Sequence, residues 1–506
     1  MLKKLFNLYP PLFSFFLSRV PPRMIEKKGE KFALAVFHQA ATRVPAYQQF
    51  LKEHKIERNS IKTIKDFKTL PFTEKNNYLK KFSLVELCLD GKIDDKYLID
   101  RSSGYSGQPF YWPRRVEEDQ DYPFYMENAY RQFYEIDKKS TLMIITLGLG
   151  TWVGGEKISW ATRQIAIKGR NRLTVITPGL ELEETIEIIK NIARYYEQVV
   201  IVGYPPFVKR IIDEGEKQGI EWPKMQVKLG LGGEGYSEQW REYMAQKIGL
   251  AENDLLGIAG GYGAADLGMS VGREYPISVL IRKWAARDSS LAQDLFGSSS
   301  DLPSFCQYNP GTFFIEEVEK ELIFTALPAI PVVRYRIHDR GGILSFSKVI
   351  EILADHGYDP FAVLADYGYQ KKDIWHLPFF YVWGRADGSV LLYGVVIYVE
   401  NIKAALAQKE LASKATGNFV LKTVFDKEQN PVLQVMIELS SGVKISENLR
   451  KEFTTVMTRV LQEQSSEYRR LFQEMGKRVM PQIRLYSYQD PDIFKAQDIK
   501  HRYTEL

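Results

Sequence analysis

The sequence has little cysteine. Its 506 residues include only Cys88 and Cys306. Two cysteines so far apart in a long chain argue against a disulfide framework and against a structural zinc site built on cysteine. They are typical of a reducing compartment, so we expect a cytoplasmic protein.

The chain also lacks an excess of charge of one sign. It has 68 basic and 63 acidic residues, a formal net charge of +5. Proteins that bind nucleic acid usually carry a strongly basic surface, and this balance does not predict one. Any site for a phosphate has to be local, and we expect no nucleic-acid partner.

A long uninterrupted hydrophobic run is missing as well. Residues 2–20 are apolar, but Pro10 and Pro11 interrupt them and no small-residue cleavage site follows. We therefore expect no transmembrane span and a segment that packs on the body of the protein. Its basic neighbours leave open a weak contact with a membrane surface. They are Lys3, Lys4, Arg19 and Arg23.

What the chain does have is enough length and apolar content for more than one folded domain. At 506 residues, with 45% hydrophobic and 26% charged residues, it exceeds the roughly 250–300 residues at which one core stops growing. Short apolar runs predict buried strands, and helical patterns lie between them at 183–196, 207–218 and 238–248. The strands are expected at 141–147, 173–176, 199–202, 228–231 and 255–259. This alternation predicts a mostly parallel sheet covered by helices, with ligands at the carboxyl ends of the strands.

One loop is unusually rich in small residues. Residues 101–109 read Arg-Ser-Ser-Gly-Tyr-Ser-Gly-Gln-Pro. Glycine and serine disfavour a helix or strand here, whereas a tight loop can direct N–H groups and hydroxyls at one anion, usually a phosphate. A solvent-exposed turn is the alternative. The candidate binding residues are Ser102, Ser103, Gly104, Ser106 and Gly107.

This loop resembles the phosphate loop of the adenylate-forming ligases, within them the phenylacetate–CoA ligase-like branch. The serines, the glycines and Pro109 fall in register, while Tyr105 and Gln108 stand where threonine and lysine are common. The resemblance continues from about Ile61 to Lys495 in six segments that keep the family's order. It implies ATP and Mg²⁺ as cofactors, a small-molecule carboxylate as substrate and coenzyme A as co-substrate.

Two further loops carry residues that the resemblance assigns to the nucleotide. Gly233 and Glu234 lie in a stretch similar to the one that contacts adenine, although Glu234 could instead simply favour the start of the next helix. Tyr262 and Gly263 begin a motif similar to Tyr-Gly-x-Thr-Glu, in which Tyr262 would stack on adenine. Asp266 would hold magnesium as a catalytic metal ligand, and Ala265 replaces the threonine.

Later segments add the ribose, hinge and substrate residues. The run that ends at Asp339 resembles the family motif whose aspartate binds both ribose hydroxyls, and a surface turn is its alternative. Arg385 would approach the ribose or phosphate, and Asp387 would be the pivot of a hinge near 384–388. A glycine-rich loop resembles the carboxylate pocket, with a plain strand-to-helix turn as the alternative reading. Its pocket residues would be Trp152, Val153 and Gly154.

The tail would supply a catalytic lysine that reaches the carboxylate and the α-phosphate. Lys495 fits the resemblance best and Lys500 is the second choice, against the commoner fate of a solvated lysine. The expected architecture is a large α/β N-terminal domain, 1–383, with mostly parallel sheets covered by helices. A small α+β lid domain, 384–506, follows it.

Together these motifs predict ATP-dependent activation of a carboxylic acid as an acyl-adenylate, followed by thioester formation with coenzyme A. An amine, a sugar or a carrier protein is the alternative acceptor. A relative that binds nucleotide without turnover is a third reading, supported by Tyr105, Ala265, His338 and Gly388. The serine-rich loop does not favour a serine hydrolase, because Gly104-Tyr105-Ser106-Gly107 lacks the spacing of a Gly-x-Ser-x-Gly elbow. The sequence names neither the acid nor the oligomeric state.

Overall fold

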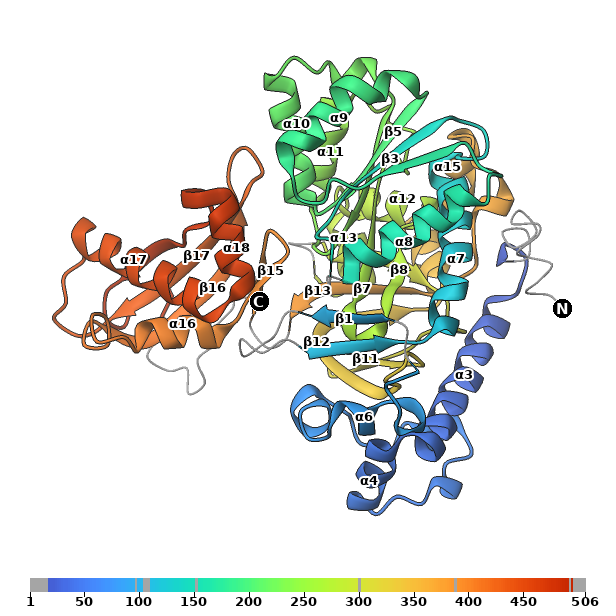
Figure 1. The fold of residues 1–506 in the computed structure, drawn as a ribbon, viewed down its shortest axis with the longest axis horizontal. Coiled ribbons are helices and arrows are strands. Elements are labelled where there is room, and N and C mark those ends of the chain that lie inside the picture. Colours follow the sequence, from blue (N-terminus) through green and yellow to red (C-terminus); the bar gives the residue numbers. More distant parts are fainter. Residues whose placement is uncertain are drawn as a thin grey trace. The chain divides into compact units, whose positions relative to one another are not determined.

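The fold was analysed in a computed structural model (Figure 1). It describes residues 17–95, 98–102, 110–150, 153–298, 302–385, 389–490 and 493–494, without the side chains of Ser102, 119–121 and Met269. The chain divides into two compact units, and the boundary lies between Trp383 and Gly384.

The first unit is organised around an eleven-stranded sheet, in the order β10-β11-β12-β13-β9-β8-β7-β6-β5-β3-β4. Its parallel half comes from the apolar runs seen in the sequence, since β4, β3, β5, β6 and β7 pair in parallel. They span Thr141–Thr146 (β3), Leu173–Ile176 (β4), Gln198–Gly203 (β5), Val227–Gly232 (β6) and Ile258–Ala264 (β7).

Helices cover both faces of this parallel half (Figure 1), because successive strand residues point to opposite sides. In β3, Leu142 and Ile144 pack against α9, α10 and α11, while Met143 and Ile145 pack against α7 and α8. These helices are α7 (Val116–Tyr134), α8 (Val153–Ile167), α9 (Leu182–Ile192), α10 (Pro205–Lys217) and α11 (Glu238–Ile248). The prediction of an α/β domain with helices on both faces of a sheet is therefore confirmed.

The other half of the sheet differs from the expected pattern, because the strand pairs named below are antiparallel. β7 pairs with β8, β8 with β9, β9 with β13, and β12 with β11, which pairs with β10. Their bounds are β8 Met269–Arg273, β9 Ser304–Tyr308, β10 Phe314–Val318, β11 Glu321–Ala326, β12 Val332–Leu344 and β13 Phe379–Arg385. Parallel pairing thus describes one half of this mixed sheet.

Four helices lie between strands of this antiparallel half. They are α12 (Pro276–Ala285), α13 (Ser289–Phe296), α14 (Phe346–Asp355) and α15 (Pro360–Asp366). Leu280 and Leu295 pack in one core with Val349 and Leu364, so the four helices share a single apolar cluster. The short 3₁₀ turn η6 (Ala265–Leu267) joins β7 to β8.

The N-terminal part of the unit is mainly helical. It contains α3 (Pro22–Arg43), α4 (Pro45–Glu53), α5 (Ile64–Phe67), the π-turn η2 (Lys75–Leu79) and α6 (Leu84–Leu87), followed by the strand pair β1 (Leu98–Ser102) and β2 (Phe110–Arg114). Leu17 is buried, and its carbonyl accepts a hydrogen bond of 3.3 Å from the His376 backbone. The rest of the predicted docking segment, 1–16, lies outside the described residues. No helix in the described part of the chain is long and apolar enough to cross a membrane.

The second unit is the small α+β domain expected from the sequence. A three-stranded sheet pairs β16 with β17 antiparallel and β17 with β18 in parallel. Phe419, Val435 and Phe453 pack in a core of its own with α16, α17 and α18. The elements are β14 (Val390–Leu392), β15 (Val395–Ile397), α16 (Val399–Leu406), β16 (Ala415–Phe425), β17 (Pro431–Leu439), α17 (Glu447–Gln464), α18 (Ser466–Met475) and β18 (Gln482–Tyr486).

Candidate active site

Two predicted nucleotide loops lie side by side because their strands are neighbours. β6 and β7 run in parallel with Gly232 opposite Gly261, so Gly233 and Glu234 leave the sheet at the same edge as Tyr262. Gly233 has φ +84°, and a Cβ there would lie 2.4 Å from the Tyr204 ring. Both the backbone conformation and the lack of space require glycine at this position.

Tyr262 and Asp339, predicted to bind adenine and ribose, contact each other. The Tyr262 hydroxyl donates a hydrogen bond to Asp339 Oδ2. The Tyr262 ring also stacks on Phe324, with ring centres 6.1 Å apart, and meets Phe380 edge-on at 5.5 Å. Asp339 is 8% exposed and lies inside β12. A surface turn, the alternative reading of this aspartate, is therefore wrong.

Asp266, the predicted magnesium ligand, lies in η6 directly after β7. Its Oδ2 accepts a hydrogen bond of 2.7 Å from the hydroxyl of Tyr335, a buried residue of β12. β7, η6 and β12 therefore bring Tyr262, Asp266 and Asp339 to one edge of the sheet.

A magnesium ion at Asp266 would need ligands from the substrate. Among the described residues, no group of three or more His, Cys, Asp and Glu side chains could hold a metal ion. Mg²⁺ commonly binds through one or two carboxylates, several waters and substrate phosphates. A single carboxylate at the edge of the sheet fits that mode of binding.

A buried ion pair that sequence reasoning missed joins the two strands that precede and follow the serine-rich stretch of the sequence. β1 and β2 flank the loop, and Arg114 Nε of β2 donates to Asp100 Oδ2 of β1 at 2.7 Å, with both side chains at most 1% exposed. Arg114 Nη2 also donates to the carbonyl of Ala265 at 3.0 Å. Arg114 thus ties β1 and β2 to the residue before Asp266. Opposite charges on either side of the loop were the available sequence signal.

Several predicted residues lie outside the described part of the chain. Ser102 ends β1 and its side chain is not described. The residues outside are Ser103, Gly104, Ser106, Gly107, Trp152, Asp387, Lys495 and Lys500. Arg385 is described as the partly buried last residue of β13. The roles of all these residues stay predictions.

A second buried network, also missed from the sequence, holds the Glu234 loop against β7. Glu274 accepts hydrogen bonds from the Tyr236 hydroxyl at 2.6 Å, from the Gly260 backbone at 2.7 Å and from Arg241 Nη2 at 2.6 Å. Burial raises the pKa of Glu274, but Arg241 and Arg282 lower it more, so its net pKa lies below the ordinary value. An ionised carboxylate therefore ties Tyr236, two residues after Glu234, to the strand that carries Tyr262.

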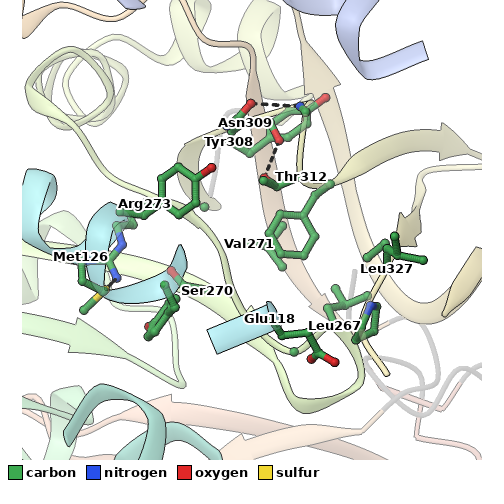
Figure 2. Close-up of a pocket in the computed structure, with 18 of the residues that line it drawn as sticks. Glu118, Met126, Leu267, Ser270, Val271, Arg273, Tyr308, Asn309, Thr312 and Leu327 are labelled. Carbon is green, nitrogen blue, oxygen red and sulfur yellow. Dashed lines mark hydrogen bonds between the residues drawn. The ribbon is translucent and has the colours of Figure 1, made fainter. Parts of the chain in front are cut away.

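A cavity of about 330 Å³ begins directly after Asp266 (Figure 2). Leu267 and Gly268, which follow that aspartate, line it together with residues of β8, α7 and the turn 309–313. Val153 and Gly154, predicted to form the carboxylate pocket, lie in the first turn of α8 and are not among the lining residues. Lys157, one turn further along α8, does line the cavity and donates a hydrogen bond of 2.7 Å to the Gly268 carbonyl.

Comparisons with known proteins agree with the motifs. No protein-family model matches the chain. It is 21% identical over 314 residues to a phenylacetate–coenzyme A ligase of Aromatoleum evansii, a match that covers 61% of this chain and 64% of that ligase. A phenylacetate–coenzyme A ligase of Pseudomonas putida is 21% identical over 301 residues, or 58% of this chain and 61% of that ligase. Each match thus spans less than two thirds of the relative's own length.

The fold likeness extends further than the sequence matches. A crystal structure of 2-hydroxyisobutyryl-CoA ligase, in complex with 2-HIB-AMP and CoA in the thioesterification state, has a TM-score of 0.61 with this chain at 13% identity. It covers 96% of this chain and 90% of the ligase chain. The fold predicted from the motifs, a large α/β unit followed by a small α+β unit, is confirmed.

Proposed function

We propose that this chain, which has the fold of the adenylate-forming ligases, activates a carboxylic acid with ATP and transfers the acyl group to coenzyme A. The observation that carries the proposal is that β12 contacts both other candidates, because its Asp339 accepts the Tyr262 hydroxyl and its Tyr335 donates to Asp266. Each comes from a segment that resembles a nucleotide-binding motif, and the fold places the segments together. The ligases that this chain resembles support the choice of reaction class.

In the first step, a carboxylate oxygen of the acid attacks the α-phosphorus of ATP, and the bond to the β-phosphate oxygen breaks. Pyrophosphate leaves and an acyl-adenylate forms. Asp339 would accept hydrogen bonds from the ribose hydroxyls, since a carboxylate has lone pairs for several donors. The N–H groups of the serine-rich loop and Lys495 would stabilise the charge on the phosphates. When bound, Mg²⁺ at Asp266 would supply further charge neutralisation.

In the second step, the thiol sulfur of coenzyme A attacks the acyl carbonyl carbon, the thiol loses its proton and AMP leaves. The two steps need different groups near the adenylate, and hinge rotation at a few residues is a common way to exchange them. We assign that rotation to residues 384–388, with Asp387 as the pivot and the second unit as the lid.

Pyrophosphate release over a panel of aryl and fatty acids, with and without coenzyme A, tests the proposal. We expect release with at least one acid and an acyl-CoA product only when coenzyme A is present. Acyl transfer to an added amine in place of coenzyme A would favour the alternative acceptor. ATP binding without any pyrophosphate release over the whole panel would favour a relative that binds without turnover, as the substitution at Ala265 suggests.

A further inference from the structure

Arg273 is partly buried and differs from the fully buried arginines of the first unit. Arg114, Arg241, Arg282 and Arg334 are each at most 6% exposed, and each forms an ion pair with a buried carboxylate. Arg273, the last residue of β8, forms none with any carboxylate in the described part of the chain. Its Nη2 instead contacts the sulfur of Met126. An arginine is always charged in proteins, and a buried charge is costly without a partner.

The cavity offers a place where an anionic partner of this guanidinium could bind. Arg273 lines the cavity, and the described side chains around it include Tyr122, Tyr275 and Met126. Figure 2 shows Arg273 beside Met126 on one side of the cavity, with Leu267 and Leu327 on the other. Arg273 therefore lies at the end of the cavity away from Leu267.

The remaining charged groups of the cavity have partners or lie at the surface. Arg115 Nε lies 3.5 Å from Glu118 Oε1, and burial raises the pKa of Glu118. Lys157 donates to the Gly268 carbonyl at 2.7 Å. Glu117 is exposed. These groups leave the charge of Arg273 uncompensated by the described side chains around it.

The shape of the cavity connects Arg273 with the proposed site of activation. The cavity begins at Leu267, next to Asp266, and β8 then rises to Arg273. At about 3.3 Å per residue, the backbone from Gly268 to Arg273 covers roughly 16 Å. Between the two ends the wall is apolar and aromatic, with Val271, Phe313 and Trp375 among its members.

We propose that Arg273 binds a second anionic group on the acid that this protein activates, so that the preferred substrates are elongated dicarboxylates. This inference rests on the proposed function, because it places the reacting carboxylate near Asp266. The apolar body of the acid fills the cavity, and its distal carboxylate pairs with the guanidinium, which is suited to bidentate carboxylate recognition. Arg273 is thus a specificity-determining residue.

Pairs of acids that differ only in a second carboxylate test the role of Arg273 separately from adenylation. Decanoate is compared with decanedioate, and phenylacetate with 4-carboxyphenylacetate, by pyrophosphate release and by calorimetric binding without ATP. We expect the wild type to favour each diacid over its monoacid by about 10- to 100-fold in kcat/KM, the range of one hydrogen-bonded charge pair. We expect Arg273→Met to lose most of that ratio and Arg273→Lys to keep part of it.

Arg194→Met serves as the matched control, since Arg194 is exposed and lies on a 3₁₀ turn away from the cavity lining. It should keep the wild-type ratio. Thermal melting checks the fold of each variant, and Arg273→Lys provides the test if Arg273→Met does not fold.

The outcomes distinguish the two proposals. Adenylation of monoacids and diacids with equal efficiency by the wild type, or an unchanged ratio in Arg273→Met, would overturn the role of Arg273 and leave the proposed function standing. Binding of a diacid that depends on Arg273, without pyrophosphate release from any acid, would support the anion site and overturn adenylation.

Discussion

Replacement of Asp339 by alanine should weaken the binding of ATP, and only through the lost contacts with the ribose. Asp339 Oδ2 already accepts the Tyr262 hydroxyl, and a carboxylate retains lone pairs for the two ribose hydroxyls. Hydrogen bonds to a charged group contribute about 1.5–3 kcal/mol each. Two such bonds together contribute about 3–6 kcal/mol. Loss of one bond alone raises the Kd about tenfold, so we expect Asp339→Ala to weaken ATP binding by tenfold or more.

The assay compares ATP with 2′,3′-dideoxy-ATP by isothermal titration. The wild type should bind the dideoxy nucleotide more weakly, whereas Asp339→Ala should bind both alike, because the partner of the missing hydroxyls has gone. Pyrophosphate affinity should stay the same in both proteins.

A control is needed for the tyrosine hydroxyl that the alanine leaves without its acceptor. Tyr262→Phe removes that hydroxyl, and the double variant isolates the ribose contribution in a mutant cycle. If Asp339→Ala still discriminates against the dideoxy nucleotide as strongly as the wild type, the assignment of Asp339 to the ribose is wrong. Equal losses for ATP and pyrophosphate would indicate damage to the fold.

Three further results follow from the site. Asp266→Ala should clearly lower the affinity for ATP in the presence of Mg²⁺ but change it little in EDTA, measured by calorimetry. Wild-type affinity of the variant in the presence of Mg²⁺ would remove Asp266 from the metal site. Lys495→Ala should abolish ATP–pyrophosphate exchange yet spare thioester formation from a supplied acyl-adenylate. Exchange at the wild-type rate would show that Lys495 is not the catalytic lysine, and Lys500 would then be tested. The depressed pKa of Glu274 gives stability that is fully present above the ordinary carboxyl pKa of 4.5 and is lost as pH falls through the lower folded pKa. Glu274→Gln should therefore lower the free energy of unfolding by about 3–5 kcal/mol near neutral pH. It should also make this free energy, measured by chemical denaturation, depend less on acid pH. Parallel plots of stability against pH for variant and wild type would refute this role of Glu274.

Local signals predicted the elements that depend on local physics. The bounds of α11 follow from Ser237, whose hydroxyl accepts the Trp240 N–H at 3.1 Å, and from Gly249, which ends the helix at φ +69°. β5 was predicted from its apolar run because both of its faces are buried. Motif resemblance then located Tyr262, Asp266 and Asp339, which the fold brings to one edge of the sheet.

Features that depend on contacts between residues far apart in the sequence could not be predicted from local patterns. β12 continues through Arg334 and His338 with positive φ values of 47° and 66°, and its register with β11 shifts twice. Non-glycine residues with positive φ are uncommon, so a strand that continues through them to Asp339 could not be predicted, and a surface turn stayed open as the alternative there. The cavity was missed for a related reason: its walls come from segments as distant as Arg115 and Trp375.

The pair formed by Asp100 and Arg114 has a consequence for how the serine-rich loop can diverge. The pair joins β1 to β2, and Arg114 also ties β2 to Ala265, so none of these bonds uses a side chain of residues 103–109. Selection can therefore exchange residues such as Tyr105 and Gln108 while the anchoring stays the same. Asp100 and Arg114, in contrast, have to change together, since either one alone would leave an unpaired charge in the interior.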